Sequence, residues 1–307
     1  NSRFFKDPNH LMKMNVINGF IIIFVTVLFA QTYGIDRSHL FQNKDSRNEV
    51  DLEELSSTQA DAFLKETSNY LFINNFGVQF NFIHKPSASN SQIIYKGFLF
   101  GIQEKSGVWK RLVLVGESDT LLCDYIFFSG EKSSAWKLNE ESLTFYSLSH
   151  EEMNESIIDS ILFRPVDILM PYLRWDHYEY LGPSRMSLNS IVQKFCFTKS
   201  EAGFMSVGGA DQVELLIDSK FRAIRKISYL KDSTIEKELS VAGFKKIKDA
   251  WFVSRLNFKN LDSKESTVLK ILNPIEESEK LDLKFFDPTQ RKTLNLNLLI
   301  KKSTLLE

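Results

Sequence analysis

Most of the chain alternates between apolar and polar residues with a period of two, which is typical of half-buried β-strands. In the range 78–85, Val78, Phe80 and Phe82 share one face, while Gln79 and Asn81 share the other. Turn residues separate further stretches of this kind, so the pattern predicts strands at 78–85, 92–103, 108–115, 120–128, 134–138, 143–148, 178–181, 191–198, 212–217, 222–230, 234–248, 251–259 and 265–272. The short links between them predict an antiparallel meander of about eleven to thirteen strands.

Three stretches have apolar residues at the spacing of 3.6 that predicts helices instead: 51–71, 151–163 and 166–173. Glu151 and Glu152 fall in the first turn of the second helix, where negative charge suits the helix dipole. Pro165 should end that helix and open the third, whose length Pro171 then limits. The sequence therefore predicts a mainly β, α+β protein with few helices.

A long antiparallel sheet with one apolar face has to cover that face. It can close into a barrel, or it can pack helices against its concave side. Phenylalanine accounts for 26 of the 307 residues, so the interior should be strongly apolar in either case. A barrel or half-barrel of this size can leave a cavity for an apolar ligand.

The N-terminal region has the features of an export signal. Lys13 supplies a positive charge, and an apolar run at 20–30 follows it. We therefore expect residues 1–34 to comprise a secretory signal peptide with its upstream residues, followed by a polar linker at 35–50. An uncleaved membrane anchor is the alternative, because the uncharged stretch 14–35 is long enough to span a bilayer.

Composition and motifs give little support to catalysis. The formal net charge is −1, so no global basic excess points to nucleic acid. The sequence contains no HExxH, CxxC or GxSxG motif, and we expect no catalytic residues, no metal site and no cofactor. Cys123 and Cys196 lie in apolar strand contexts; two buried free thiols are the first interpretation, and a disulfide is the alternative.

The order of several motifs resembles the outer-membrane lipoprotein-sorting proteins, which have the LolA/LolB-like fold. PVDILMPYLRWDHYEYLGP (165–183) is similar to the family's short helix and the strand that follows it. VELLIDSKFRAIRKISYL (213–230) resembles its strand–turn–strand unit, and KELSVAGFKKIKDAWFVSRLNFKNLDSKESTVLKIL (237–272) resembles three consecutive strands. FFDPTQ (285–290) resembles a common C-terminal element, so the resemblance covers roughly 76–290.

The resemblance implies a curved antiparallel half-barrel of about eleven strands at 51–290, whose concave apolar face is covered by short helices, with a C-terminal tail at 291–307. It implies a hydrophobic cavity whose wall candidates are Val78, Phe80, Phe82, Phe98, Phe100 and Ile102. Its lid candidates are Ile157, Ile158, Ile161, Leu162, Ile168, Leu169 and Leu173. For any single one of these residues, ordinary core packing is the competing interpretation.

The function that the resemblance implies is that of a monomeric periplasmic carrier. It would bind acyl chains of lipoproteins or phospholipids and pass them toward the outer membrane. Its partners would include an inner-membrane release transporter and an outer-membrane acceptor. The alternative is a non-catalytic interaction or sensor module of the same fold, whose core is filled by its own side chains.

Overall fold

The computed structural model describes residues 52–69, 75–87, 91–116, 119–130, 132–175, 177–187, 190–199, 207–247, 250–275 and 281–290. The predicted signal peptide, the linker and the C-terminal tail at 291–307 lie outside these ranges. Within them, no helix is both long enough and apolar enough to cross a membrane.

The described chain is dominated by antiparallel strands, as the alternating pattern predicts. The strands are β1 (Phe76–Lys85), β2 (Ile93–Glu104), β3 (Gly107–Val115), β4 (Leu121–Gly130), β5 (Ser134–Asn139), β6 (Thr144–Ser147), β7 (His177–Ser187), β8 (Ser190–Thr198), β9 (Gln212–Asp218), β10 (Ile224–Lys231), β11 (Thr234–Ile247), β12 (Ala250–Asn260) and β13 (Ser266–Pro274). These thirteen strands form one sheet, slightly larger than the expected sheet of about eleven.

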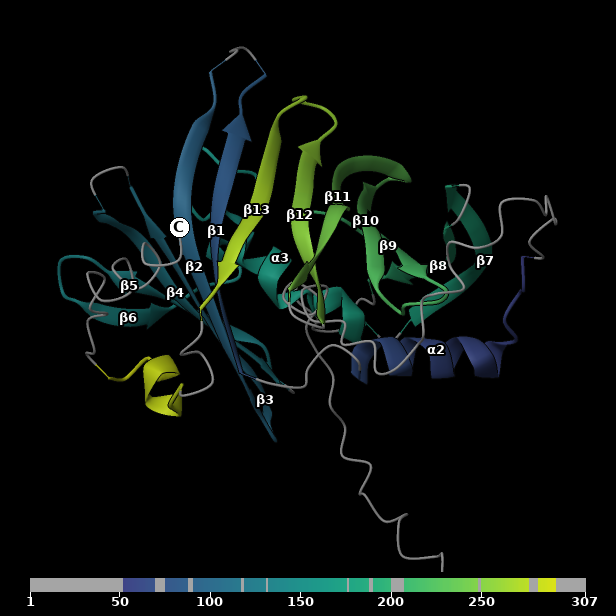
Figure 1. Ribbon diagram of the computed structural model, residues 1–307, viewed down its shortest axis with the longest axis horizontal. Helices are drawn as coiled ribbons and strands as arrows, with labels where there is room; N and C mark the ends of the chain where they lie inside the picture. The colour runs from purple at the N-terminus through teal and green to yellow at the C-terminus, as the bar shows by residue number, and fades with distance from the viewer. Residues whose placement is uncertain are drawn as a thin grey trace, which may run out of the picture.

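The strand order is β6-β5-β4-β3-β2-β1-β13-β12-β11-β10-β9-β8-β7. Each strand therefore pairs with its neighbour in sequence, except at the centre, where β1 pairs with β13, and at the two edges, where β6 and β7 remain apart. The sheet is open and curves around a short helix, which confirms the predicted half-barrel (Figure 1).

The helical elements are short: α2 (Ser57–Asn69), α3 (Pro165–Leu169), and the 3₁₀ turns η2 (Glu152–Asn154), η3 (Pro171–Arg174) and η5 (Leu283–Phe286). At the start of α2, the backbone N–H of Gln59 donates to the hydroxyl of Ser56, and the side chain of Gln59 accepts from the backbone N–H of Ser56. This reciprocal capping explains why the helix predicted over 51–71 begins only at Ser57.

The helix predicted over 151–163 is wrong, because only the η2 turn forms there. The backbone N–H of Ile157 donates to the carbonyl of Phe163, and that of Leu162 donates to the hydroxyl of Thr267, so neither follows the helical i→i−4 pattern. The helix predicted over 166–173 is divided into α3 and η3. The break lies at Met170, which has a left-handed φ of 47°, before Pro171, which has no N–H to continue the helix.

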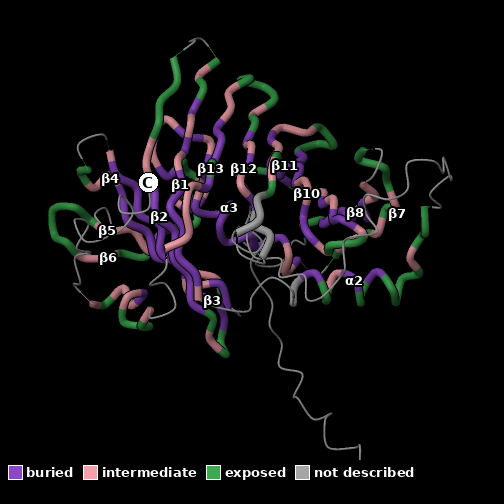
Figure 2. Tube along the Cα trace, in the orientation of Figure 1, coloured by how far each residue is buried: buried purple, intermediate pink, exposed green. Residues whose placement is uncertain are grey.

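Two hydrophobic clusters lie on opposite faces of the sheet. The larger cluster lies on the inner face and joins α2 and the segment around α3 to strands from both halves. The smaller cluster lies on the outer face of β2 and β3, where η5 covers it with Phe285 and Phe286. Figure 2 shows that buried residues are concentrated in β1–β4 and around α3, whereas the tips of the hairpins are exposed.

Glycines determine which face of β2 is directed inward. A Cβ on Gly97 would lie 2.2 Å from the ring of Phe80, and one on Gly101 would lie 2.0 Å from the ring of Phe76. The inner positions of β2 are therefore Gly97, Leu99 and Gly101, because the β1 rings occupy the space that larger side chains would need. The larger apolar residues of β2 are consequently turned to the outer face.

The inner cluster should dominate stability. Phe258 is fully buried in it and contacts Phe163 edge to face, with ring centroids 5.0 Å apart. We expect Phe258→Ala to lower the free energy of unfolding by about 3–5 kcal/mol in urea denaturation, through lost contacts and a residual cavity. Leu261→Ala, at an exposed residue just beyond β12, should cost less than about 1 kcal/mol. Equal losses for the two variants would contradict this account of the core.

Candidate functional site

The connection between β6 and β7 crosses the inner face of the sheet. The two strands are consecutive in sequence but form opposite edges, so the chain between them has to run from one edge to the other. We call residues 148–175 of this connection the lid segment; it contains η2, α3 and η3. Figure 1 shows α3 lying between the two halves of the curved sheet.

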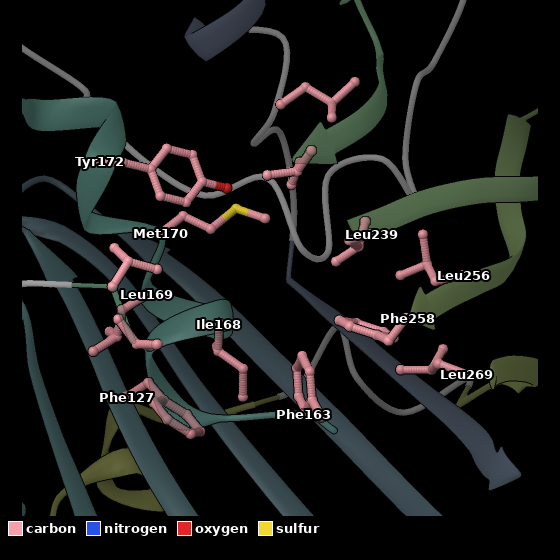
Figure 3. Packing of buried hydrophobic residues seen from close by; sticks show 14 of the residues in the cluster. Phe127, Phe163, Ile168, Leu169, Met170, Tyr172, Leu239, Leu256, Phe258 and Leu269 are labelled. Atoms are coloured by element: carbon pink, nitrogen blue, oxygen red, sulfur yellow. The ribbon is translucent and has the colours of Figure 1, made fainter. Parts of the chain in front are cut away.

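The lid segment presents apolar side chains to both halves of the sheet. The ring of Phe163 lies 5.3 Å from that of Phe82 on β1 and 5.0 Å from that of Phe258 on β12. Ile168 and Leu169 on α3 are buried beside Phe127, as Figure 3 shows. The lid segment therefore fills the space that the sheet encloses.

The structure brings together ten of the thirteen residues that were predicted to form a wall or a lid. Three wall residues and seven lid residues belong to the inner cluster or pack against it: Val78, Phe80, Phe82, Ile157, Ile158, Ile161, Leu162, Ile168, Leu169 and Leu173. Ile158, Leu162 and Leu173 are only partly buried.

The other three predicted wall residues, Phe98, Phe100 and Ile102, lie on the opposite face, in the outer cluster under η5. They do not contribute to the face that the lid segment covers. The bulk of their side chains suggested an inward orientation, but the rings of Phe80 and Phe76 leave room only for glycine at the neighbouring inner positions.

A buried group of charges attaches α3 to the second half of the sheet. The Nζ of Lys237, on β11, donates to Oδ2 of Asp167 at 2.6 Å and to the carbonyl of Leu162 at 2.7 Å. Arg164 also pairs with Asp167, at 3.1 Å, so one carboxylate holds two cations. The Asp167 side chain also accepts from the backbone N–H of Arg164, which caps the start of α3.

A second lysine attaches α3 to the first half of the sheet. Lys110, on β3, is fully buried, and its Nζ donates to the carbonyl of Ile168 at 2.8 Å. That carbonyl lies in the last turn of α3, where helical carbonyls have no partner within the helix. The two lysines thus hold the same short helix from opposite sides.

Neutral hydrogen bonds complete the attachment of the lid segment. The hydroxyl of Tyr125, on β4, donates to the carbonyl of Ile157 at 3.2 Å. The hydroxyl of Thr267, on β13, accepts from the backbone N–H of Leu162 at 3.0 Å. At the start of the lid segment, the backbone N–H of Leu148 donates to the carbonyl of Ala135 on β5 at 2.9 Å. Most of the other contact between the lid segment and the sheet is apolar.

Burial and ion pairing shift the pKa of Asp167 in opposite directions. Burial alone would raise the pKa of Asp167, but Arg164 and Lys237 outweigh that effect and hold it at about 2. Burial lowers the pKa of Lys237 to about 8, although Asp167 acts in the opposite direction. At neutral pH the carboxylate is ionised and Lys237 is mostly protonated, so the group remains an ion pair.

The lid segment and the sheet are packed closely in this structure. Phe163, Ile168 and Tyr172 are fully buried, and Leu169 and Met170 nearly so. A cavity of about 330 Å³ lies away from α3, between Trp136 and Phe145 of the β5–β6 hairpin and Pro288 of the C-terminal segment. Because Phe163, Ile168 and Tyr172 are buried against the sheet, a ligand in their place would have to displace the lid segment.

Among the described residues, neither a metal-ligand cluster nor an activated thiol is seen. No group of three or more histidine, cysteine, aspartate or glutamate residues within the described ranges could hold a metal ion. Cys123 and Cys196 are buried and free, which confirms the first interpretation of these thiols. Burial raises the pKa of both thiols, so neither is activated as a nucleophile.

Sequence reasoning missed Lys110, Asp167 and Lys237 as attachment residues. The sequence does hold a signal for two of them: Lys110 interrupts the apolar strand VWKRLVLV, and Asp167 is the one acidic residue in PVDILM. A charged residue at an apolar position is informative, because burial of a charge is costly unless the charge is paired. The partners themselves are distant in sequence, so no local pattern identifies them.

Comparisons with known proteins agree with this architecture. No family model and no curated protein matches the sequence. Among solved structures, a DUF1329 family protein from Desulfovibrio piger matches with a TM-score of 0.63 at 11% identity, over 75% of this chain and 97% of that one. An outer membrane lipoprotein-sorting protein domain from Vibrio parahaemolyticus matches with a TM-score of 0.58 at 11% identity, over 71% and 95%.

A LolA superfamily protein from Nitrosomonas europaea matches with a TM-score of 0.51 at 14% identity, over 70% of this chain and 92% of that one. The chain therefore has a LolA-like fold, as the motif order predicts. At identities this low, the structural similarity establishes the fold alone. The function therefore has to be argued from the site.

Because Asp167 helps to attach α3, the free energy of unfolding should fall as the pH is lowered below about 5. Because the pKa of Asp167 is about 2 in the folded chain and ordinarily 3.8, the unfolded chain binds the proton first as pH falls. The wild type should therefore lose about 2 kcal/mol of unfolding free energy through this group between pH 5 and pH 2.

Asp167→Asn should lack that part of the pH dependence. It should also be less stable at pH 7 by about 3–5 kcal/mol, because it removes the carboxylate that pairs with the buried Lys237 and the partly buried Arg164. Urea denaturation at several pH values measures both effects. Parallel pH profiles for the wild type and the variant would contradict the assignment.

Proposed function

We propose that this protein is a non-catalytic periplasmic carrier that binds acyl chains of lipoproteins or lipids beneath the lid segment and passes them toward the outer membrane. The observation that carries the proposal is the inner face itself. It is a broad apolar surface, and at its centre it is covered by one irregular connection that few polar contacts attach.

Such a face suits acyl chains for a simple energetic reason. Each methylene group that leaves water contributes about 0.8 kcal/mol, so a partly buried chain can offset the loss of contacts between the lid segment and the sheet. The side chains beneath the lid segment are mainly aliphatic and aromatic, for example Leu256, Phe258 and Leu269 (Figure 3). An acyl chain could replace Ile168 and Phe163 against these apolar side chains.

The proposal includes a cellular setting that follows from the N-terminal pattern. A signal peptide within residues 1–34 would deliver the protein to the periplasm, where it would act as a monomer. An inner-membrane transporter would release the cargo to it, and an outer-membrane acceptor would receive it. The LolA-like fold supports this setting, since two of the similar structures are described as a lipoprotein-sorting protein domain and a LolA superfamily protein.

A second function is favoured by one specific observation. The inner core is filled by side chains of the lid segment that are almost completely buried, among them Phe163, Ile168 and Tyr172. A permanently filled core would make the protein an interaction or sensor module of the same fold rather than a carrier. The two functions differ in whether the lid segment leaves the sheet to admit a ligand.

The test is uptake of a synthetic triacylated lipopeptide, measured by native mass spectrometry. The wild type should form a 1:1 complex. Asp167→Asn should take up the lipopeptide at least about tenfold faster, because a loss of 1.4 kcal/mol or more from the closed state raises the open population by that factor. Glu238→Gln, on β11 next to Lys237, is the control, since Glu238 pairs with Lys226 away from the lid segment and its loss should leave uptake unchanged.

If neither the wild type nor Asp167→Asn acquires the mass of the lipopeptide while both remain folded by circular dichroism, the carrier function is wrong. The interaction module would then be the better description. If all three proteins take up the lipopeptide equally fast, a ligand binds, but the charges around α3 do not control its entry.

A further inference from the structure

The two lysines that hold α3 differ in their partners. Lys237 lies against the carboxylate of Asp167 at 2.6 Å. Lys110 is fully buried and donates to the carbonyl of Ile168, and no described carboxylate lies within ion-pair distance of it. Its nearest neighbours across the sheet are Gly101 on β2 and Phe127 on β4, neither of which can neutralise an ammonium group.

A single carbonyl is a poor partner for a buried ammonium group. Lysine has three N–H donors, and a charge in an apolar interior is costly unless it is paired with an opposite charge. Burial accordingly lowers the pKa of Lys110 well below its ordinary value. If closure of the lid segment were the only role of this position, an apolar residue of similar size would be less costly.

Displacement of the lid segment changes the charge of the inner face. Asp167 belongs to the lid segment and would leave together with Arg164, to which it is paired. Lys110 and Lys237 belong to the sheet and would remain. Four carboxylates of the described strands form ion pairs: Asp124, Glu214, Asp218 and Glu238. Each of them alternates with inner-face residues of its strand, so it points to the outer face.

The opened face would therefore be apolar and positively charged. Its complement is an amphiphile with an apolar chain and an anionic headgroup. Lys110 is better placed than Lys237 to receive the headgroup, because its position in the closed state has no carboxylate that would compete for it.

We propose that the ligand of the inner face is an anionic lipid whose headgroup, a carboxylate or a phosphate, pairs with the ammonium group of Lys110 in place of the Ile168 carbonyl. This inference rests on the proposed carrier function and adds the class of headgroup to it. The acyl chain would lie along the apolar face, and Lys110 would determine headgroup preference.

The experiment compares three lipids with the same oleoyl chain. Oleate carries a carboxylate, oleoyl lysophosphatidylglycerol carries a phosphate, and monoolein is neutral. Affinities are measured by isothermal titration calorimetry below the micellar concentration, for the wild type, Lys110→Gln and Lys96→Gln. Lys110→Gln keeps a donor for the Ile168 carbonyl but removes the charge. Lys96→Gln removes the same charge from a partly exposed position on the adjacent strand, β2, where Lys96 pairs with Asp119.

The wild type and Lys96→Gln should bind at least one of the anionic lipids about tenfold or more tightly than monoolein. Lys110→Gln should lose that preference while it keeps the affinity for monoolein. If Lys110→Gln loses affinity for oleate alone, the headgroup is a carboxylate. If it loses affinity for oleoyl lysophosphatidylglycerol alone, the headgroup is a phosphate. If it loses affinity for both, either headgroup is accepted.

Other outcomes overturn the inference. If the wild type binds all three lipids equally, or if Lys110→Gln weakens all three equally, Lys110 does not select the headgroup, although the carrier function stands. If the wild type binds none of them but still takes up the triacylated lipopeptide, the inference about the headgroup fails and the carrier function stands; if it takes up neither, both proposals fail.

A second measurement needs no variant and applies even if Lys110→Gln does not fold. A carbodiimide treatment of the wild-type complex with oleate should join the carboxylate to the Lys110 amine as an amide, with loss of water. Peptide mass spectrometry should locate the oleoyl group on Lys110. An oleoyl group on exposed lysines such as Lys96, and not on Lys110, would contradict the inference.

Discussion

The connectivity of the sheet imposes the constraint on which the rest of the structure depends. β6 and β7 are consecutive in sequence but form the two edges of a thirteen-stranded sheet, so residues 148–175 have to cross its inner face. The same connection therefore completes the core and covers the surface that a ligand would need. Under the proposed function, stability and binding would therefore compete for the same contacts.

The attachment of the lid segment reflects this competition. Its apolar side chains contribute the larger part of the packing, whereas Lys110 and Lys237 determine where α3 lies between the two halves of the sheet. A buried ion pair gives little net stability compared with an apolar contact of the same size, but it is specific about geometry. The arrangement thus suits a segment that has to return to one closed position after it has been displaced.

The sequence predicted the sheet well, because alternation of apolar and polar residues is a local signal that short turns reinforce. It also placed Val78, Phe80, Phe82 and the apolar lid residues correctly on one face. Phe98, Phe100 and Ile102 were assigned to the wrong face, because the cause lies on another strand: the rings of Phe76 and Phe80 occupy the space beside Gly101 and Gly97.

The helix predicted over 151–163 failed for a similar reason, since tertiary contacts such as that between Leu162 and Thr267 replace the helical hydrogen bonds. The charges that hold α3 were not predictable either. Asp167 and Lys237 are far apart in sequence, and only the fold shows that they meet. Local patterns predicted the elements, whereas contacts between distant residues determined the site.

The central claim is that the lid segment opens as a unit while the sheet stays folded. Native-state hydrogen exchange measures this most directly. The amides of Ile161, Asp167 and Met170, each hydrogen-bonded within the lid segment, should exchange together and faster than the amides of central strands such as β12 and β13. Exchange of the lid amides as slowly as that of the central strands, through global unfolding alone, would contradict the account.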